Sequence, residues 1–130
     1  MNNRSVIRLL IIDDEDEVLL VLKETGRAQG FEVSLAASVA EALRLLADGL
    51  AVDLVLCDLT MPDGGAAAWM RACLAAHPEL ASRTVVITGW APPSDTDPSA
   101  VAGITTERYL CKPFAMSDVR RLAERIIYPV

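Results

Sequence analysis

The sequence predicts a single α/β domain built on a doubly wound, mostly parallel sheet. The chain has 130 residues, which is the size of one domain. Short apolar runs alternate with amphipathic stretches, a pattern typical of right-handed βαβ units. Hydrophobic residues make up 52% of the chain and the mean hydropathy is +0.33. These values exclude a disordered chain and fit strands that are buried on both faces.

The first strand and helix pairs follow directly from this pattern. Val6–Ile12 is almost wholly apolar, as a central parallel strand should be. Glu15–Ala28 carries its apolar residues on one helical face, and Phe31–Ala36 forms the next strand. The capping box Ser38–Glu41 begins a second helix, which ends at Gly49.

The middle of the chain repeats the alternation. Leu54–Cys57 is the third strand, and the turn residues Met61–Gly65 separate it from a helix over Ala66–Ala76. The dipeptide His77–Pro78 closes that helix, because a residue before proline avoids the α region. Val85–Ile87 is the fourth strand.

The segment Ala91–Thr106 departs from the alternation. It contains three prolines where a fourth helix would be expected, so we predict a short or irregular element there. Tyr109–Cys111 then forms a fifth strand. Ser117 is expected to cap a last helix that extends to Ile127.

Charge and cysteine content exclude several classes of protein. The chain has 18 acidic and 12 basic residues, a net charge of −6, which argues against a nucleic-acid-binding surface. No apolar run approaches the ~20 residues of a membrane span, and the polar start does not resemble a signal peptide. Cys57, Cys73 and Cys111 are odd in number and lack a CxxC spacing. We therefore expect reduced, buried thiols in a cytoplasmic protein without a membrane partner.

Five side chains that can carry chemistry follow the ends of four different strands. Asp13 and Asp14 follow the first strand, Asp58 the third, Thr88 the fourth and Lys112 the fifth. In an open parallel sheet, ligands bind beyond the carboxyl ends of the strands. We therefore expect these five side chains to converge at one edge of the sheet.

The chemistry of this set indicates a metal and a phosphoryl group. Two carboxylates ~4 Å apart repel each other by about 4 kcal/mol at an effective dielectric constant of 20. A hard cation relieves such repulsion, and an oxygen-rich set of ligands suits Mg²⁺. Lys112 and Thr88 could hold phosphoryl oxygens, and Asp58 could form an acyl-phosphate. Taken singly, Asp13 and Asp14 could cap a helix, and Lys112 could be a solvated surface residue.

Four motifs in this order resemble the receiver domain of two-component response regulators. They are Ile11–Glu15, Leu56–Gly64, Ile87–Gly89 and Tyr109–Phe114, and the resemblance extends over Arg8–Ile127. It implies a flavodoxin-like sheet of five strands in the order 2-1-3-4-5, and one receiver domain over residues 1–130. Such a domain is a phosphoacceptor in signal transduction and not an enzyme, apart from its own phosphorylation and dephosphorylation.

The resemblance assigns a role to each acidic residue. Asp58 would accept a phosphoryl group from a phosphohistidine on a histidine kinase or a histidine phosphotransfer domain. Asp14 and Asp58 would hold Mg²⁺ together with the carbonyl of Thr60, and Asp13 would act mainly through a coordinated water.

The resemblance also implies a conformational switch. Thr88 and Lys112 would hold phosphoryl oxygens, and Tyr109 would turn inward when Thr88 moves. The bond between Lys112 and Pro113 would be cis. The motif Ile87–Trp90, followed by a proline-containing loop, resembles the C-terminal receivers of hybrid sensor kinases, which implies a fused kinase in a longer protein.

Two alternatives from other classes remain. Asp14 and Asp16 fit the nucleophile and general acid of haloacid-dehalogenase-type phosphatases, but that assignment leaves Asp58 unexplained. The other alternative is an interaction module that acts without phosphorylation.

Overall fold

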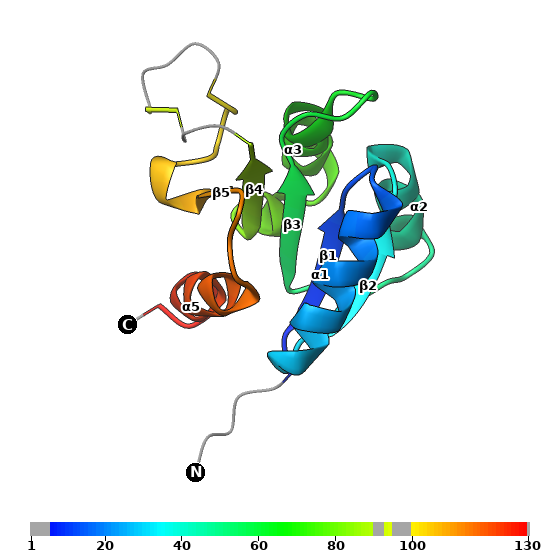
Figure 1. Cartoon of the computed structure of the whole chain (residues 1–130). Helices are drawn as coiled ribbons and strands as arrows, with labels where there is room; N and C mark the ends of the chain where they lie inside the picture. The colour runs from blue at the N-terminus through cyan, green and yellow to red at the C-terminus, as the bar shows by residue number, and fades with distance from the viewer. Residues whose placement is uncertain (1–5, 90–92, 95–99, 130) are drawn as a thin grey trace.

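The five strands form one parallel sheet in the order β2-β1-β3-β4-β5, as the resemblance implies (Figure 1). The structure is a computed structural model that describes residues 6–89, 93–94 and 100–129. The strands are β1 (Arg8–Ile12), β2 (Glu32–Ala36), β3 (Leu54–Asp58), β4 (Thr84–Thr88) and β5 (Tyr109–Cys111). The predicted fold class is confirmed.

Helices cover both faces of the sheet. They are α1 (Asp16–Ala28), α2 (Val39–Ala47), α3 (Gly65–Ala76), α4 (Pro78–Ala81) and α5 (Met116–Ile127). One hydrophobic cluster joins α2, α3 and α4 to one face, and a second cluster joins α1 and α5 to the other. Leu10 and Ile12 of β1 belong to the first cluster, whereas Leu9 and Ile11 belong to the second. Burial of alternate residues on opposite faces explains why β1 is a continuous apolar run.

The predicted cap of α2 is present, with one difference of detail. The Ser38 hydroxyl accepts a hydrogen bond from the Glu41 N–H at 3.0 Å. The Glu41 carboxylate, however, accepts from the N–H of Ala37 at 3.4 Å, one residue earlier than in a standard capping box.

The predicted cap of α5 was wrong. The helix begins at Met116, so Ser117 lies within its first turn rather than before it. The carboxylate of Asp118 accepts from the N–H of Ala115 at 3.0 Å and so satisfies the backbone at this end. An aspartate in the first turn also interacts favourably with the helix dipole.

The chain after α3 forms one helix that the sequence did not indicate. His77 ends α3 as predicted, but Pro78 then begins the short helix α4. Proline is well suited to the first helical position, because that position needs no N–H donor.

The segment between β4 and β5 is irregular where it is described. Residues 93–94 and 100–108 contain no α-helix, and a 3-10 turn occupies Thr106–Arg108. This agrees with the predicted irregular or shortened element. Residues 90–92 and 95–99 lie outside the described part of the chain.

The cysteine prediction holds for two of the three thiols. All three are free, and Cys57 and Cys73 are buried, but Cys111 is exposed. The reason is that Cys111 is the last residue of β5, an edge strand with a neighbour on only one side. No helix in the described ranges is long and apolar enough to cross a membrane.

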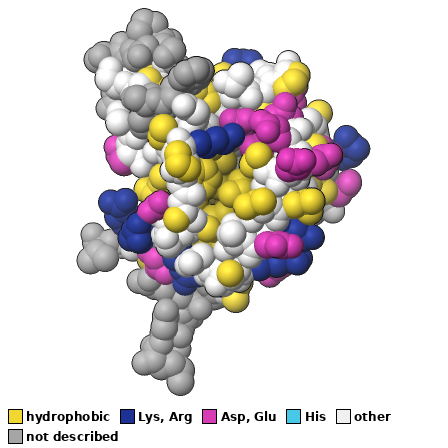
Figure 2. Space-filling view, viewed as in Figure 1, with side chains coloured by type: hydrophobic (Ala, Val, Ile, Leu, Met, Phe, Trp, Pro, Cys, Tyr) yellow, Lys and Arg dark blue, Asp and Glu magenta, His cyan; other side chains and the backbone are white. Residues whose placement is uncertain are grey.

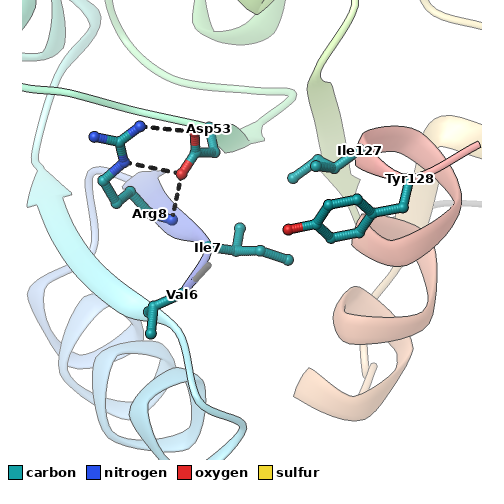
Figure 3. Close-up of a pocket in the computed structure, with 6 residues that line it drawn as sticks. All are labelled: Val6, Ile7, Arg8, Asp53, Ile127 and Tyr128. Carbon is teal, nitrogen blue, oxygen red and sulfur yellow. Dashed lines mark hydrogen bonds and ion pairs between the residues drawn. The ribbon is translucent and has the colours of Figure 1, made fainter. Parts of the chain in front are cut away.

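An ion pair joins the start of β1 to Asp53, the residue before β3, at the end of the sheet opposite the carboxyl ends of the strands. The main-chain N–H and the guanidinium of Arg8 both donate to the Asp53 carboxylate, the closest pairs being 2.9 Å apart (Figure 3). This guanidinium lowers the pKa of Asp53. A hollow of about 440 Å³ lies beside the pair and is also lined by Ile127 and Tyr128 at the end of α5.

Candidate functional site

The sheet register brings the predicted site residues to one edge. Ile12 pairs with Cys57, so Asp13 and Asp58 follow neighbouring positions on β1 and β3. Thr88 pairs with Cys111, which places Lys112 directly after the partner of Thr88. The carboxyl ends of β1, β3, β4 and β5 therefore converge, as the sequence predicts.

Three carboxylates form a tight group at this edge. Asp13, Asp14 and Asp58 each offer an oxygen, and these oxygens all lie within 4.8 Å of one another. Asp13 and Asp58 are buried, with 0% and 8% of their surfaces exposed, whereas Asp14 is exposed. Asp16, which the phosphatase alternative requires, is exposed on the first turn of α1 and does not belong to the group.

Asp13 carries an oxygen whose environment fits a bound cation. Its Oδ1 accepts from the N–H of Glu15 at 2.9 Å. Its Oδ2 is buried and has no hydrogen-bond partner in the part of the chain that the structure describes. Among the described residues, the Lys112 ammonium is the cation nearest to this oxygen, with its Nζ 4.0 Å from Oδ2 and so beyond hydrogen-bond distance. Burying a carboxylate oxygen without a hydrogen-bond donor costs free energy, and coordination of a hard divalent cation by this oxygen would offset that cost.

The electrostatic state of the group follows from burial and from the neighbouring charges. Burial is the main cause that raises the pKa of Asp58, and the Asp13 carboxylate raises it further. The Lys112 ammonium and a backbone hydrogen bond from Thr60 oppose this increase. Burial also raises the pKa of Asp13, against the Glu15 N–H and Lys112. The site thus holds negative charge that its own residues do not fully neutralise.

The backbone around Lys112 is held to β4. The Lys112 N–H donates to the carbonyl of Thr88 at 2.8 Å, and the Lys112–Pro113 peptide bond is cis, as the resemblance implies. Thr88 itself is buried at the end of β4. The backbone of Lys112 therefore lies directly beside the end of β4.

A sharp turn after β3 returns the chain to α3. Gly65 has a φ of +56°, and a Cβ at this position would lie 2.3 Å from the carbonyl oxygen of Leu59. Only glycine allows this close approach. The turn is also joined to α2, because the Asp63 carboxylate accepts from the N–H of Val39 at 2.7 Å. This role of Asp63 was not predicted from the sequence, although a carboxylate beside Pro62 and Gly64 is a turn signal.

Tyr109 lies inside the domain. Its side chain is buried, and its hydroxyl accepts from the N–H of Val101 at 2.8 Å. Tyr109 pairs with Val86 of β4, two residues before Thr88. The aromatic ring and the buried threonine therefore belong to adjacent strands.

Comparison with known proteins identifies the family. A family model of the response regulator receiver domain matches residues 9–124. The chain belongs to this family. It is 33% identical over 119 residues to the transcriptional regulatory protein CpxR of Escherichia coli (strain K12), covering 92% of this chain and 47% of CpxR. This receiver domain therefore spans about half the length of that relative.

Solved structures show the same receiver fold. A CheY-like response regulator receiver domain from Methylobacillus flagellatus has a TM-score of 0.77 and 24% identity, covering 94% of this chain and 99% of that one. The response regulator TrrA from Thermotoga maritima, in complex with Mg²⁺–BeF, has a TM-score of 0.75 and 23% identity, covering 93% and 99%. The receiver domain is a signalling domain, and neither the family match nor these relatives support the phosphatase alternative.

Proposed function

We propose that Asp58 is the phosphoryl acceptor of this receiver domain and that a histidine kinase or a histidine phosphotransfer domain is the donor. The observation that carries the proposal is the convergence of a buried Asp58 with two further aspartates and with Lys112 at one edge of the sheet. Because three carboxylates at one edge repel one another, a purely structural role does not explain their convergence.

The transfer would proceed by nucleophilic attack. A carboxylate oxygen of Asp58 attacks the phosphorus, the bond between phosphorus and the imidazole nitrogen breaks, and the nitrogen keeps the electron pair and takes up a proton. The product is an acyl-phosphate on Asp58. Loss of the group to water would return the free carboxylate.

The other residues of the edge would bind and orient the group. Asp13, Asp14 and Asp58, with the carbonyl of Thr60, are the proposed ligands of Mg²⁺. When bound, the cation supplies positive charge to the phosphoryl oxygens. Lys112 neutralises another oxygen as a point charge, and the hydroxyl of Thr88 donates to a third. Because the phosphorylated state would attract Thr88, it would favour a different packing of Thr88 and Tyr109.

An apolar groove beside the site supports a protein donor. The groove has a volume of about 470 Å³ and runs from Lys112 and Pro113 along α1. Its lining is mostly apolar, with Val18, Val21, Leu22 and Phe114 among the residues. Figure 2 shows this hydrophobic hollow with acidic and basic side chains at its edge. Val21 is 60% exposed, so a partner that covers this face would bury apolar surface in the groove that Lys112 also lines.

Phosphorylation by a small donor tests the proposal. The protein is incubated with Mg²⁺ and acetyl phosphate, and its intact mass is recorded, with Asp58→Asn as the variant and Asp16→Asn as the matched control. We expect a gain of one phosphoryl group in the wild type and in Asp16→Asn, and none in Asp58→Asn. A gain that persists in Asp58→Asn and is lost in Asp14→Asn would favour the phosphatase alternative. No gain in the wild type, with Mg²⁺ bound, would favour an interaction module.

We propose the cytoplasm as the compartment in which this domain acts. A phosphohistidine donor places this domain in the cytoplasm, where it would act as a phosphoprotein of a two-component system or phosphorelay. A fused kinase in a longer protein would be a donor of the same chemistry.

A further inference from the structure

The loop between β3 and α3, residues 59–64, forms one side of the proposed Mg²⁺ site. It follows directly on Asp58, the last residue of β3. The N–H of Thr60 donates to the Asp58 carboxylate, and the carbonyl of Thr60 is one of the proposed metal ligands. The position of this loop therefore sets where two of the proposed ligands lie relative to the aspartates that follow β1.

Backbone contacts hold the loop at both of its ends. The N–H of Leu59 donates to the carbonyl of Ile87 in β4 at 2.8 Å. The N–H of Gly64 donates to the carbonyl of Met61 at 3.0 Å, which closes a turn within the loop. These contacts fix the loop to β4 and to itself, whereas its contact with α2 is made by a side chain.

Asp63 joins the loop to the start of α2. Its Oδ2 accepts from the N–H of Val39 at 2.7 Å, although the two residues are 24 positions apart in the sequence. Val39 is the first residue of α2, so its N–H has no acceptor within the helix. Ser38 accepts from a different donor of the same turn, the N–H of Glu41. A carboxylate at this end of a helix also interacts favourably with the helix dipole and makes a charge-assisted hydrogen bond.

The start of α2 is in turn joined to the end of β1. The carbonyl of Ala36, the last residue of β2, accepts from the N–H of Asp13 at 3.1 Å. Only two residues separate Ala36 from Val39. A short path of hydrogen bonds and covalent chain therefore runs from Asp13 to the start of α2, and on to Asp63 in the loop.

We propose that Asp63 is a positioning residue of the Mg²⁺ site, which fixes the loop of Thr60 relative to Asp13 through the start of α2. The inference rests on the proposed function, because the Mg²⁺ ligands are those proposed there. Within the described ranges, Asp63 is not part of the group of carboxylates whose oxygens lie within 4.8 Å, so it acts through the loop and not as a ligand. Thermodynamic linkage makes the effect reciprocal: if the contact between Asp63 and Val39 favours Mg²⁺ binding, bound Mg²⁺ stabilises that contact to the same extent.

Calorimetric titration of the metal-free protein with Mg²⁺ tests this role. Asp63→Ala removes the acceptor of the Val39 N–H, and we expect the Kd for Mg²⁺ to rise about tenfold, as when a residue that orients a metal ligand is lost. Asp63→Asn removes the charge but keeps an acceptor oxygen, so its Kd should stay within about threefold of the wild type. An unchanged Kd in Asp63→Ala would overturn the proposal. Equal losses in Asp63→Asn and Asp63→Ala would also overturn it, because the charge alone would then explain the effect.

Ser38→Ala is the matched control at the same helix end. It removes the acceptor of the Glu41 N–H and weakens the first turn of α2, but it leaves the carboxylate of Asp63 in the loop. We expect its Kd for Mg²⁺ to stay within about twofold of the wild type. A rise as large as in Asp63→Ala would show that the affinity depends on the helix start and not on the link to the loop, which would overturn the proposal.

Residue-resolved hydrogen exchange of the wild type tests the reciprocal effect without any substitution. We expect saturating Mg²⁺ to slow exchange of the Val39 N–H by about tenfold, the factor expected for the Kd in Asp63→Ala. The N–H of Asp53, which donates to the carbonyl of Arg8 at the opposite edge of the sheet, is the internal control and should change little. Bound Mg²⁺ without slower exchange at Val39 would overturn the proposal even if Asp63→Ala failed to fold.

The same samples distinguish a failure of this inference from a failure of the proposed function. An unchanged Kd in Asp63→Ala, together with a phosphoryl gain in the wild type from acetyl phosphate, would refute the role of Asp63 and leave the proposed function intact. Mg²⁺ binding without a phosphoryl gain would refute the proposed function, and the titrations of Asp63→Ala and Asp63→Asn would still decide the role of Asp63. A wild type that binds no Mg²⁺ would refute both.

Discussion

Replacing Asp13 by asparagine should stabilise the metal-free domain. Asparagine keeps the oxygen that accepts from the N–H of Glu15, whereas alanine would lose that hydrogen bond. The substitution removes the negative charge of a fully buried residue. The Oδ2 of Asp13 has no hydrogen-bond partner within the described residues. The change therefore isolates the charge of Asp13 from its role in the turn.

The magnitude follows from two opposing interactions. The oxygens of Asp13 and Asp58 lie within 4.8 Å, so their repulsion is about 3.5 kcal/mol at an effective dielectric constant of 20. The attraction of Lys112 at 4.0 Å is about 4 kcal/mol on the same scale. Because the Lys112 side chain is 35% exposed, solvent weakens this attraction. The weakened attraction does not offset the free-energy cost of burying the Asp13 carboxylate. We expect Asp13→Asn to raise the free energy of unfolding by roughly 1–3 kcal/mol.

Urea unfolding in the presence of EDTA at neutral pH measures this difference. Asp16→Asn is the matched control, because Asp16 is exposed and outside the acidic group, and it should stay within about 0.5 kcal/mol of the wild type. With Mg²⁺ at 100 times its dissociation constant, the wild type should gain about 2.7 kcal/mol and the variant less. A variant Asp13→Asn that is less stable than the wild type in EDTA would show that the buried charge of Asp13 does not destabilise the metal-free domain.

The two buried carboxylates should also make the stability of the metal-free wild type depend on pH. The pKa values of Asp13 and Asp58 are raised from 3.8, so the native state binds more protons than the unfolded state in the window above that value. The free energy of unfolding should therefore increase as the pH falls from neutral into this window, because protonation of the two groups favours the native state. Asp13→Asn should show a smaller increase, and equal slopes for the two proteins in EDTA would contradict the assignment.

Three further predictions concern the scaffold. Trp69→Phe should lower the free energy of unfolding by about 1–3 kcal/mol, since Trp69 is fully buried and its ring N–H donates to a threonine hydroxyl at 3.0 Å; equal midpoints in urea would contradict this. Gly65→Ala should cost about 2 kcal/mol or more, and the matched Gly49→Ala only about 1 kcal/mol, because both glycines have positive φ but only Gly65 has a carbonyl in the space of a Cβ. Asp53→Asn should destabilise the domain near neutral pH, since Arg8 lowers the pKa of Asp53. That difference should shrink as the pH falls through the lowered pKa, and a constant difference in thermal unfolding would refute it.

The layered fold and the residues at the carboxyl edge of the sheet can be predicted from local sequence patterns. Apolar runs such as Leu54–Cys57 predict buried strands because both faces of a parallel sheet are covered. Once the strands are parallel, the residue after each strand reaches the same edge, so Asp13, Asp58 and Lys112 could be grouped from their positions alone. The order of the strands came from the resemblance and not from periodicity.

The hydrogen-bond partner of a polar group, by contrast, depends on how the elements pack in the folded domain. Ser117 and Asp118 could each serve the start of α5, and the place where the helix begins selected Asp118. Cys111 is exposed because β5 lies at the edge of the sheet, which no local pattern reveals. The carbonyl partners of Arg108 lie as far as 27 residues away along the chain. Periodicity reports which face of an element is buried, whereas the acceptor of a long side chain depends on which backbone groups the packed fold leaves without partners.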